Sequence, residues 1–339
     1  MTFRRILLFL LLIVPAVAVA SGEPPSYFEV TFLTTNDLHS RILPYDVPPN
    51  PEKNFPGAKG LGGAARRATV FKRVRAEMTT PVLLLDSGDT TYRSSYMARG
   101  YQGLADMAVM NAVRYDAAAP GNHDLEWTAP QLRRLFEASE FPWVCANLVY
   151  AATGETFLPP YTIKEVGGVR IAFFGLITSE GENNPQLYVA YPELGLKTLP
   201  PIEVARRLVP ELRGKADIVV CLSHLGTTPD VQLAQQVPGI DAILGGHWHQ
   251  LVTPPRMVSV GERTAFSLGA VPIVQAGAYG EWVGRTKLIF RRDPGSGRYT
   301  LMSCKGEMVH IDPSIPDDPE IKAMIDKMEK ARKAREGRE

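Results

Sequence analysis

Cysteine is scarce in this sequence, and its pattern excludes several kinds of site. The 339 residues include three cysteines, Cys145, Cys221 and Cys304, which lie far apart. An odd number excludes complete pairing within the chain, and no Cys-x-x-Cys spacing of a metal or redox site is present. Cys145 and Cys221 stand in apolar, strand-like surroundings, so we expect free thiols in the core.

An excess of charge of either sign is also missing. Lys and Arg number 37 against 36 Asp and Glu, which gives a formal net charge of +1. This balance offers no electrostatic basis for a nucleic acid polymer or a membrane surface as the main partner. The hydrophobic share of 45% and the charged share of 22% are ordinary for a globular protein with a large core.

The apolar run at the N-terminus, from Ile6 to Val14, is short for a bilayer span. Arg4 and Arg5 precede the run and Ala18-Val19-Ala20 ends it, which is the pattern of a secretory signal peptide. We therefore predict a signal peptide at 1–20, a secreted or periplasmic protein, and no stable membrane span after cleavage. An uncleaved anchor helix is the alternative.

Apolar runs and turn signals alternate along the rest of the chain. Strands are expected at 28–34, 82–85, before 119, 143–146, 169–176, 218–222 and 241–244, and antiparallel strands at 271–276, 282–290 and 299–311. Helices are expected after Gly63 and at 97–113, 128–138 and 317–339. The sequence has no repeats, so this alternation predicts an α/β layered sandwich.

The last predicted helix carries a narrow apolar stripe, made of Ile321, Met324, Ile325 and Met328. An association surface for a second chain or another partner is one use for such a stripe. The basic run at 330–335 is expected to be a solvated helix face.

Polar side chains stand at the ends of five of the predicted strands. These clusters are Asp37 with His39, Asp89, Asn122 with His123, His224, and His247 with His249. They contain five of the chain's six histidines. In layered α/β folds, ligands bind where strand ends and their loops converge. Imidazole, carboxylate and amide donors without thiolate suit Zn, Mn, Fe or Co in a reactive site.

Spacing within these clusters supports a shared site. Asp37 and His39 are two residues apart, as are His247 and His249, and in extended backbone such side chains point to the same side. Asn122 and His123 are adjacent, so they are expected to do different things, and Gly121 permits a sharp turn before them. The imidazole of His123 is then free to donate a proton or to steady an anion.

The order Asp-x-His, Gly-Asp, Gly-Asn-His-Asp, Ser-His and Gly-His-x-His resembles the calcineurin-like metallophosphoesterases. The stretches at 34–39 (Thr-Thr-Asn-Asp-Leu-His), 62–67 (Gly-Gly-Ala-Ala-Arg-Arg) and 223–226 (Ser-His-Leu-Gly) are similar to the exported 5′-nucleotidase and 2′,3′-cyclic phosphodiesterase branch. The resemblance runs from about Phe28 to about Asp312. It implies a four-layer α/β/β/α sandwich of the metallo-dependent phosphatase type.

The resemblance also implies a role for each cluster residue. One divalent metal ion would be bound by Asp37, His39, Asp89 and His249, and a second by Asp89, Asn122, His224 and His247. His123 matches the family's catalytic histidine. Glu126 stands where the family usually has an Asp that orients this histidine. Asp86 matches no ligand position and is read as a supporting strand-end residue, and Trp248 is expected to pack on a neighbouring layer.

The implied function is an exported dinuclear-metal phosphoesterase that acts on small-molecule phosphoesters. It would hydrolyse nucleotides, as a 5′-nucleotidase does, or 2′,3′-cyclic nucleotides, by attack of a metal-bridging hydroxide. A hydrolase of another ester, similar to thiosulfohydrolases, is an alternative. A non-catalytic metal-binding or partner-binding module is the alternative from another class.

The resemblance divides the chain into a signal peptide (1–20), a catalytic domain (21–312) and a charged, linker-like helix (313–339). Nucleotidases of this branch carry a second domain that binds the base, and no such segment follows the helix in this sequence. Base preference is therefore not carried over, and an open, unselective site is expected. Arg41, Tyr92 and Arg93 are residues that could shape a pocket instead.

Overall fold

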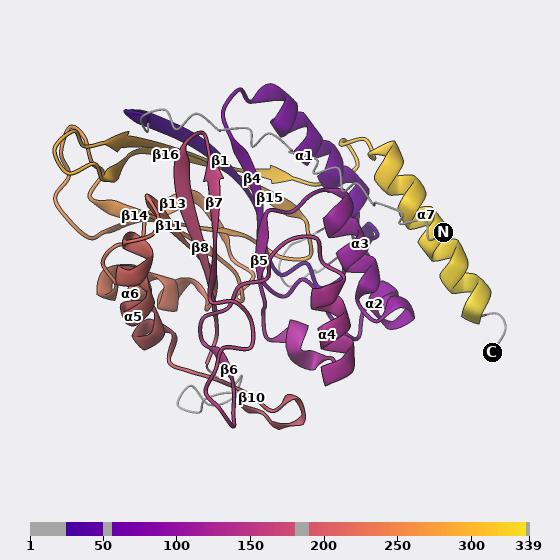
Figure 1. Cartoon of the computed structure of the whole chain (residues 1–339). Helices are drawn as coiled ribbons and strands as arrows, with labels where there is room; N and C mark the ends of the chain where they lie inside the picture. The colour runs from indigo at the N-terminus through magenta and orange to yellow at the C-terminus, as the bar shows by residue number, and fades with distance from the viewer. Residues whose placement is uncertain (1–24, 50–55, 180–189, 337–339) are drawn as a thin grey trace, which may run out of the picture.

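Two β-sheets packed face to face form the centre of the molecule, a computed structural model that describes residues 25–49, 56–179 and 190–336 (Figure 1). The predicted signal peptide at 1–20 lies outside these residues. The first sheet has the strand order β16 (Tyr299–His310), β15 (Trp282–Arg292), β1 (Tyr27–Thr35), β4 (Val82–Ser87) and β5 (Ala117–Ala119). The second has the order β13 (Leu251–Ser259), β14 (Ala270–Ala276), β12 (Ala242–Gly245), β11 (Ile218–His224), β8 (Val169–Ile177) and β7 (Tyr161–Val166).

Helices cover the outer face of each sheet. Over the first sheet lie α1 (Ala64–Glu77), α2 (Tyr96–Tyr101), α3 (Leu104–Ala112), α4 (Ala129–Glu137) and α7 (Pro319–Glu336). Over the second sheet lie α5 (Pro201–Arg213) and α6 (Thr227–Gln236), which appear together beside it in Figure 1. The order helix, sheet, sheet, helix confirms the expected four-layer sandwich.

Smaller elements complete the described chain. The strands β6 (Leu148–Tyr150), β10 (Leu196–Thr198) and β9 (Ala190–Tyr191) form a small sheet near α4, and β2 (Tyr45–Val47) pairs with β3 (Ala58–Leu61). Two short 3-10 helices are η2 (His123–Glu126) and η3 (Pro192–Leu194).

The interior between the sheets is apolar. Phe32 of β1 and Phe173 of β8 meet edge to face there, with ring centroids 6.0 Å apart. The run Val82–Leu85 forms most of β4, and its leucines are buried, as expected for a strand covered on both faces. Burial of so much apolar surface is the main force that holds the two sheets together.

The direction of the central strands determines where loops gather. β1, β4 and β5 run parallel, and so do β8, β11, β12 and β14. Parallel strands place their carboxyl ends at one edge of a sheet, so the loops that follow β1, β4, β5, β11 and β12 can converge. These are the strands that the polar clusters follow.

Some predicted elements differ from the structure. The helix expected at 97–113 is two helices, because Gln102 and Gly103 adopt left-handed φ values of 53° and 79° between α2 and α3. The strand expected at 143–146 is irregular, with one bridge from Trp143 to Ala118. Of the three C-terminal strands, β14 lies in the second sheet and pairs parallel with β12, while β15 and β16 pair antiparallel in the first.

The apolar stripe of α7 faces the molecule's own core. Ile321 and Ile325 are buried, and Met324 and Met328 pack against the same cluster. The helix itself lies mainly against α1, with α2 and α3 also in contact (Figure 1). The alternative use of this stripe as an association surface is therefore wrong. The basic run is only partly solvated, because Arg332 is buried with its guanidinium 3.4 Å from the ring centre of Tyr96.

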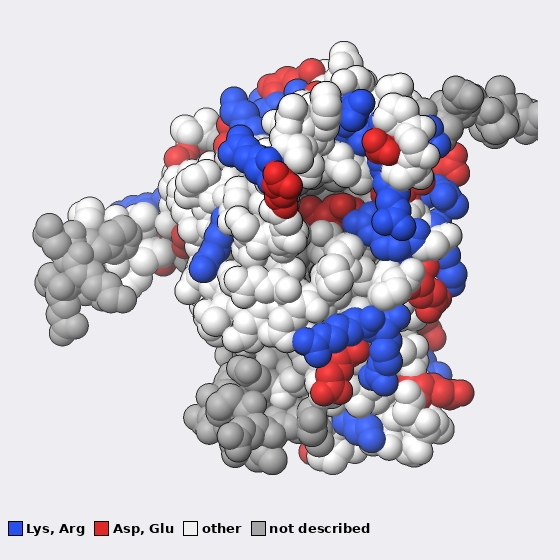
Figure 2. Space-filling view, turned by 90° about the vertical axis from the view of Figure 1, so that its left-hand side faces the viewer, with Lys and Arg blue, Asp and Glu red and all other residues white. Residues whose placement is uncertain are grey.

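The surface of the described chain carries mixed charge. On the face shown in Figure 2, acidic and basic side chains lie among one another and among uncharged areas. Within the described ranges, none of the helices has both the length and the apolar character needed to cross a membrane.

Candidate metal centre

All the predicted metal-ligand clusters meet at the edge where the parallel strands end. Side-chain atoms of Asp37, His39 and His249 lie within 4.8 Å of one another. The same limit holds for the group of Asp89, His224 and His247. We call these the open half and the deep half of the centre. Five strands from two sheets contribute to it, so the site depends on the whole sandwich.

The open half brings three donor atoms to one point. His39 Nε2 lies 3.0 Å from His249 Nε2, and His249 Nε2 lies 3.3 Å from Asp37 Oδ1. His39 and Asp37 are buried, whereas the side chain of His249 is 36% exposed. Solvent and small molecules therefore reach the centre from this half.

The deep half is organised by the buried ring of His224. Its Nδ1 lies 2.7 Å from the carbonyl oxygen of Ser87, which can only accept, so Nδ1 carries the proton. Nε2 is then unprotonated in the neutral ring and lies 3.1 Å from Asp89 Oδ2. The other oxygen of Asp89 accepts the backbone N–H of His123 at 2.8 Å. A ligand histidine oriented through its second nitrogen is usual at metal sites.

Asp89 connects the two halves. Its Oδ2 lies 3.9 Å from His39 Nε2 in the open half as well as close to His224 in the deep half. Gly121 makes this approach possible, because a Cβ at that position would lie 2.1 Å from Asp89 Oδ1. Close packing against Asp89 therefore requires a glycine at position 121. The sharp turn predicted from sequence explains this glycine less well.

One buried polar atom at the centre lacks the partner that burial normally demands, and a second has only a carboxylate beside it. Among the described residues, Asn122 Oδ1 makes no hydrogen bond, and His224 Nε2 lies 3.1 Å from Asp89 Oδ2. An unsatisfied buried polar atom costs about 1–3 kcal/mol, so native proteins rarely keep one without a ligand. Both atoms are good donors to a divalent cation, and the set of nitrogen and oxygen donors fits Zn, Mn, Fe or Co.

The pKa values show how strongly the centre's charges interact. Burial works to lower the pKa of His224, but the carboxylates of Asp89 and Asp37 outweigh it and raise the pKa to about 10. Burial lowers the pKa of His39 to about 4, and burial together with His224 lowers the pKa of His247 to about 4. The neutral imidazoles of His39 and His247 therefore lie beside a protonated His224 ring that is paired with Asp89, and a cation bound here would take the place of that ring's extra proton.

The backbone of the candidate ligands has a conformation that the sequence pattern did not predict. Asp37, His39, Asp89, His247 and His249 all have positive φ, between 48° and 83°. Residues other than glycine seldom adopt this region, and such strain gathers at functional sites. The pairs Asp37/His39 and His247/His249 therefore converge through left-handed turns, and the extended geometry assumed from their spacing is wrong.

His123 lies beside the centre and is held by Glu126. The imidazole Nδ1 is 2.6 Å from Glu126 Oε1, so the longer side chain does reach the ring. Burial works to lower the pKa of His123, but Asp89 and Glu126 raise it above its ordinary value. Atoms of His123, His39 and Asp89 also lie within 4.8 Å of one another. A protonated imidazole at this position can donate to an anion bound at the centre.

Asp86 stabilises the strand ends next to the centre through hydrogen bonds. Its carboxylate accepts hydrogen bonds from Thr35 Oγ1 at 2.6 Å, Thr90 Oγ1 at 2.8 Å and the Gly88 N–H at 3.0 Å. It does not belong to either group of metal donors. The sequence interpretation of Asp86 as a supporting strand-end residue agrees with this position.

Aromatic residues border the open half. Tyr279, which the sequence analysis missed, lies edge-on to His249 and tilted to His39, with ring centroids 5.2 and 5.4 Å away. The guanidinium carbon of Arg41 lies 4.6 Å from the ring centre of Tyr45 and 5.6 Å from that of Tyr279. The turn Ala-Gly-Ala-Tyr-Gly before β15 carries no polar cluster, so no signal pointed to Tyr279.

Trp248 does not pack on a neighbouring layer as predicted. It is 41% exposed, and its ring lies so close to Gly226 that a Cβ there would meet the indole at 2.5 Å.

Tyr92 lies edge-on to His123, with ring centroids 5.1 Å apart, and Arg93 Nη1 lies 3.5 Å from the carbonyl oxygen of Glu126.

Comparison with known families agrees with this geometry. Residues 30–251 match the model of the calcineurin-like phosphoesterase family. The chain belongs to that family. Phosphoester hydrolysis assisted by metal ions is the family's chemistry, and the candidate donors of this phosphoesterase form the three overlapping groups described above.

Individual relatives of this phosphoesterase include several nucleotidases. It is 31% identical to a snake venom 5′-nucleotidase of Naja atra, over 89% of this chain and 57% of the relative. It is 30% identical to human 5′-nucleotidase, over 88% of this chain and 52% of the relative. The structure of a 5′-nucleotidase precursor from Thermus thermophilus matches with a TM-score of 0.76 and 28% identity, over 91% of this chain and 59% of that one. The chain thus spans about half the length of the curated relatives it matches.

Proposed function

We propose that this protein is an exported phosphoesterase with two metal ions that hydrolyses nucleotides or similar small phosphate monoesters. The observation that carries the proposal is the position of Asp89 Oδ2 between the two donor groups, 3.9 Å from His39 Nε2 and 3.1 Å from His224 Nε2, with Asn122 Oδ1 buried and without a hydrogen-bond partner among the described residues. The 5′-nucleotidase relatives support nucleotides as the substrate class.

In this proposal each half of the centre holds one divalent ion. Asp37, His39, Asp89 and His249 hold the first, and Asp89, Asn122, His224 and His247 hold the second. Two such ions would lower the pKa of a bound water and would offset charge on the phosphoryl group. Asp89 would be shared by both, because its Oδ2 lies near a histidine of each half.

The chain's own residues supply orientation and a proton. Glu126 accepts the Nδ1 proton of His123 and so directs the other ring nitrogen toward the centre. From there His123 stabilises the phosphoryl oxygens or protonates the leaving oxygen. The raised pKa of His123 keeps it protonated at neutral pH more often than an isolated histidine.

The proposal also includes export and the division of the chain. Residues 1–20 act as the signal peptide and 21–312 as the catalytic unit, followed by the helical segment 313–339. N-terminal sequencing of protein recovered from the extracellular or periplasmic fraction tests this. A mature chain that starts with Ser21 is expected, and an intact Met1 in that fraction would contradict it.

A substrate panel on metal-reconstituted protein tests the activity. With added Mn or Zn, release of phosphate from AMP, UMP, 2′,3′-cyclic AMP or p-nitrophenyl phosphate is expected. Activity on a thiosulfate ester alone would favour the other hydrolase chemistry. No turnover of any ester, with metal bound, would point to a binding module and overturn the proposal.

A further inference from the structure

The ring of Tyr279 contacts two candidate metal ligands of the open half. It lies edge-on to His249 and tilted to His39, with ring centroids 5.2 and 5.4 Å away. The histidines face each other through Nε2 at 3.0 Å, so the Nδ1 atom of each ring points away from the place where the donors meet. Tyr279 is half-buried, and none of the roles proposed above involves it.

The hydrogen bond that usually orients a ligand histidine is missing from both of these rings. Such a histidine normally donates the N–H of its second nitrogen to a fixed oxygen. His224 of the deep half does so, with Nδ1 2.7 Å from the carbonyl oxygen of Ser87. In the described part of the chain, no group forms a hydrogen bond with Nδ1 of His39 or of His249. Contacts of another kind therefore fix the orientation of these two rings.

Aromatic packing provides those contacts. Aromatic rings attract one another in edge-to-face arrangements with centroids about 4.5–7 Å apart. Apart from His39, Tyr279 is the one ring beside His249 within the described ranges. His39 also has Tyr92 and His123 beside it, with centroids 5.6 and 5.1 Å away. Loss of the Tyr279 ring should therefore affect His249, the more exposed of the two histidines, most strongly.

The turn that carries Tyr279 is fixed to the segment that follows β1. Tyr279 has a left-handed φ of 58°, and its backbone N–H donates to the carbonyl oxygen of Asp37 at 2.7 Å. Asn36 donates from Nδ2 to the carbonyl of Gly277 at 2.7 Å and accepts the N–H of Ala276 at 2.7 Å. A bulky residue seldom adopts such a φ, and it keeps it where the surrounding structure holds it, often at functional sites. The segment that leads to the open half thus also places the ring against it.

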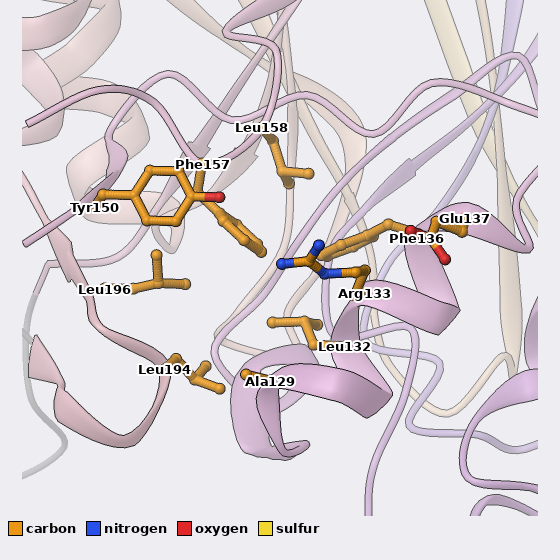
Figure 3. Close-up of a pocket in the computed structure, with 10 residues that line it drawn as sticks. All are labelled: Ala129, Leu132, Arg133, Phe136, Glu137, Tyr150, Phe157, Leu158, Leu194 and Leu196. Carbon is orange, nitrogen blue, oxygen red and sulfur yellow. The ribbon is translucent and has the colours of Figure 1, made fainter. Parts of the chain in front are cut away.

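Aromatic rings elsewhere in the described chain pack mainly on one another. Beside α4, Tyr150 and Phe157 meet edge to face with centroids 5.5 Å apart, in the wall of a pocket of about 290 Å³ that is lined mainly by apolar side chains (Figure 3). None of the candidate metal ligands lines this pocket. A tyrosine ring held against two candidate ligands is therefore a particular feature of the centre.

We propose that Tyr279 is a positioning residue, whose ring orients His39 and His249 in place of hydrogen bonds so that they hold the first divalent ion. This inference rests on the proposed function, because it concerns one of the two ions assigned there. The ring makes both contacts, and the hydroxyl group of Tyr279 forms no hydrogen bond with the described residues. The open half therefore requires the aromatic ring and not the hydroxyl group.

Titration of the metal-free protein with Zn²⁺, followed by calorimetry, tests this without any substrate. The wild type should bind two ions. Tyr279→Ala should bind one ion with wild-type affinity and the other about 10–100-fold more weakly, the usual effect of losing a group that orients a metal ligand. Tyr279→Phe keeps the ring and should match the wild type. Adding Tyr279→Ala to His249→Ala should weaken zinc binding no further than His249→Ala alone, since both changes act on the same ion.

Tyr150→Ala is the matched control, because it removes a tyrosine ring from an aromatic pair that contacts no candidate ligand. It should bind both ions as the wild type does. Thermal unfolding in EDTA shows whether each variant is folded. If Tyr279→Ala is unfolded, Tyr279→Leu takes its place with the same expected result, because leucine fills much of the space without an aromatic ring.

Three results would overturn the inference while two ions in the wild type still support the proposed function. They are unchanged affinities in Tyr279→Ala, equal weakening of both ions in that variant, and the same loss in Tyr279→Phe as in Tyr279→Ala. Fewer than two ions in the wild type would overturn the proposed function and this inference together.

Discussion

The two halves of the metal centre use the same kinds of donor, two of them buried in each half, and differ in the exposure of the third. His249 of the open half has a side chain that is 36% exposed, whereas His224 of the deep half is fully buried and oriented by the Ser87 carbonyl. A buried donor held by a second contact cannot leave without disturbing the core. We therefore expect the deep half to hold its ion through exchange and the open half to be the one that substrate and chelators reach.

In each half, a serine next to a candidate ligand histidine donates a hydrogen bond to a buried carboxylate. In the open half, Ser40 next to His39 donates a hydrogen bond to Asp106 at 3.0 Å. In the deep half, Ser223 next to His224 donates one to Asp230. Both carboxyl groups are buried, and burial raises the pKa of each to about 7. The two halves therefore differ in their exposure to solvent. They are alike in that a buried carboxylate accepts a hydrogen bond from the serine next to a histidine.

Asp89→Ala should have the largest effect, because it breaks both halves at once. Its carboxylate lies close to a histidine of each half. The variant is expected to lose both metal ions on dialysis and to show only background hydrolysis, as measured by elemental analysis and phosphate release. Asp326→Ala, which removes an exposed carboxylate on α7, should retain both. One tightly held ion in Asp89→Ala would contradict the shared role.

His123→Ala should damage the chemistry and leave both halves intact. We expect kcat to fall by about 10²–10⁴-fold, the usual range for a positioned acid–base group, with unchanged metal content. Glu126→Gln should lower kcat by about tenfold, since it weakens the orientation of the ring without removing it. If His123→Ala loses metal, then His123 is a ligand and its proposed role is wrong.

His249→Ala and His224→Ala should separate the halves. His249→Ala is expected to lose one metal ion and to keep the unfolding temperature of the metal-free protein, because the side chain is partly exposed. His224→Ala should lower the unfolding free energy by about 1–3 kcal/mol even without metal, since it leaves the buried Ser87 carbonyl unpaired. Calorimetry in EDTA measures the unfolding temperature and the unfolding free energy of each metal-free variant. Equal losses of stability would show that depth does not distinguish the halves.

The buried acids should make the smallest difference, visible as a pH dependence. The folded-state pKa of Asp106 and of Asp230, about 7, lies above the unfolded value of 3.8, chiefly because of burial. The stability that the protonated acids contribute is therefore fully present below about pH 3.8 and is lost as the pH rises through about 7. Asn does not titrate, so Asp106→Asn and Asp230→Asn should gain stability relative to wild type between pH 5.5 and 8.5.

Urea unfolding of the metal-free proteins at both pH values provides this measurement. Asp116→Asn is the comparison, because Asp116 is a half-buried acid outside the centre. A similar gain in stability in this variant would contradict the idea that the effect is particular to Asp106 and Asp230. A gain in only one of the two buried variants would show that the halves are supported differently after all.

The sequence predicted the layers and most of the long elements because they depend on local patterns. Apolar runs such as 82–85 are strands wherever they are buried, and the structure places them in the two central sheets. It predicted neither α5 nor α6, although Pro201 at the start of α5 and Glu203 in its first turn are signals that favour the start of a helix. The break between α2 and α3 was also missed, because a single left-handed Gln102 ends the first helix.

By itself the sequence predicted which side chains lie together at the centre, because an ordered series of Asp, Asn and His at strand ends is unusual enough to indicate a shared site. Only the tertiary structure decided how they meet: left-handed backbone at Asp37 and His39, and Gly121 packed against Asp89. It alone placed α7 on the core and Tyr279 beside the histidines. The physical reason is the distance along the chain over which each feature is set. Burial patterns and motifs are local in sequence, whereas the depth of a side chain, backbone strain and the shape of a cleft arise from contacts between residues far apart in the chain.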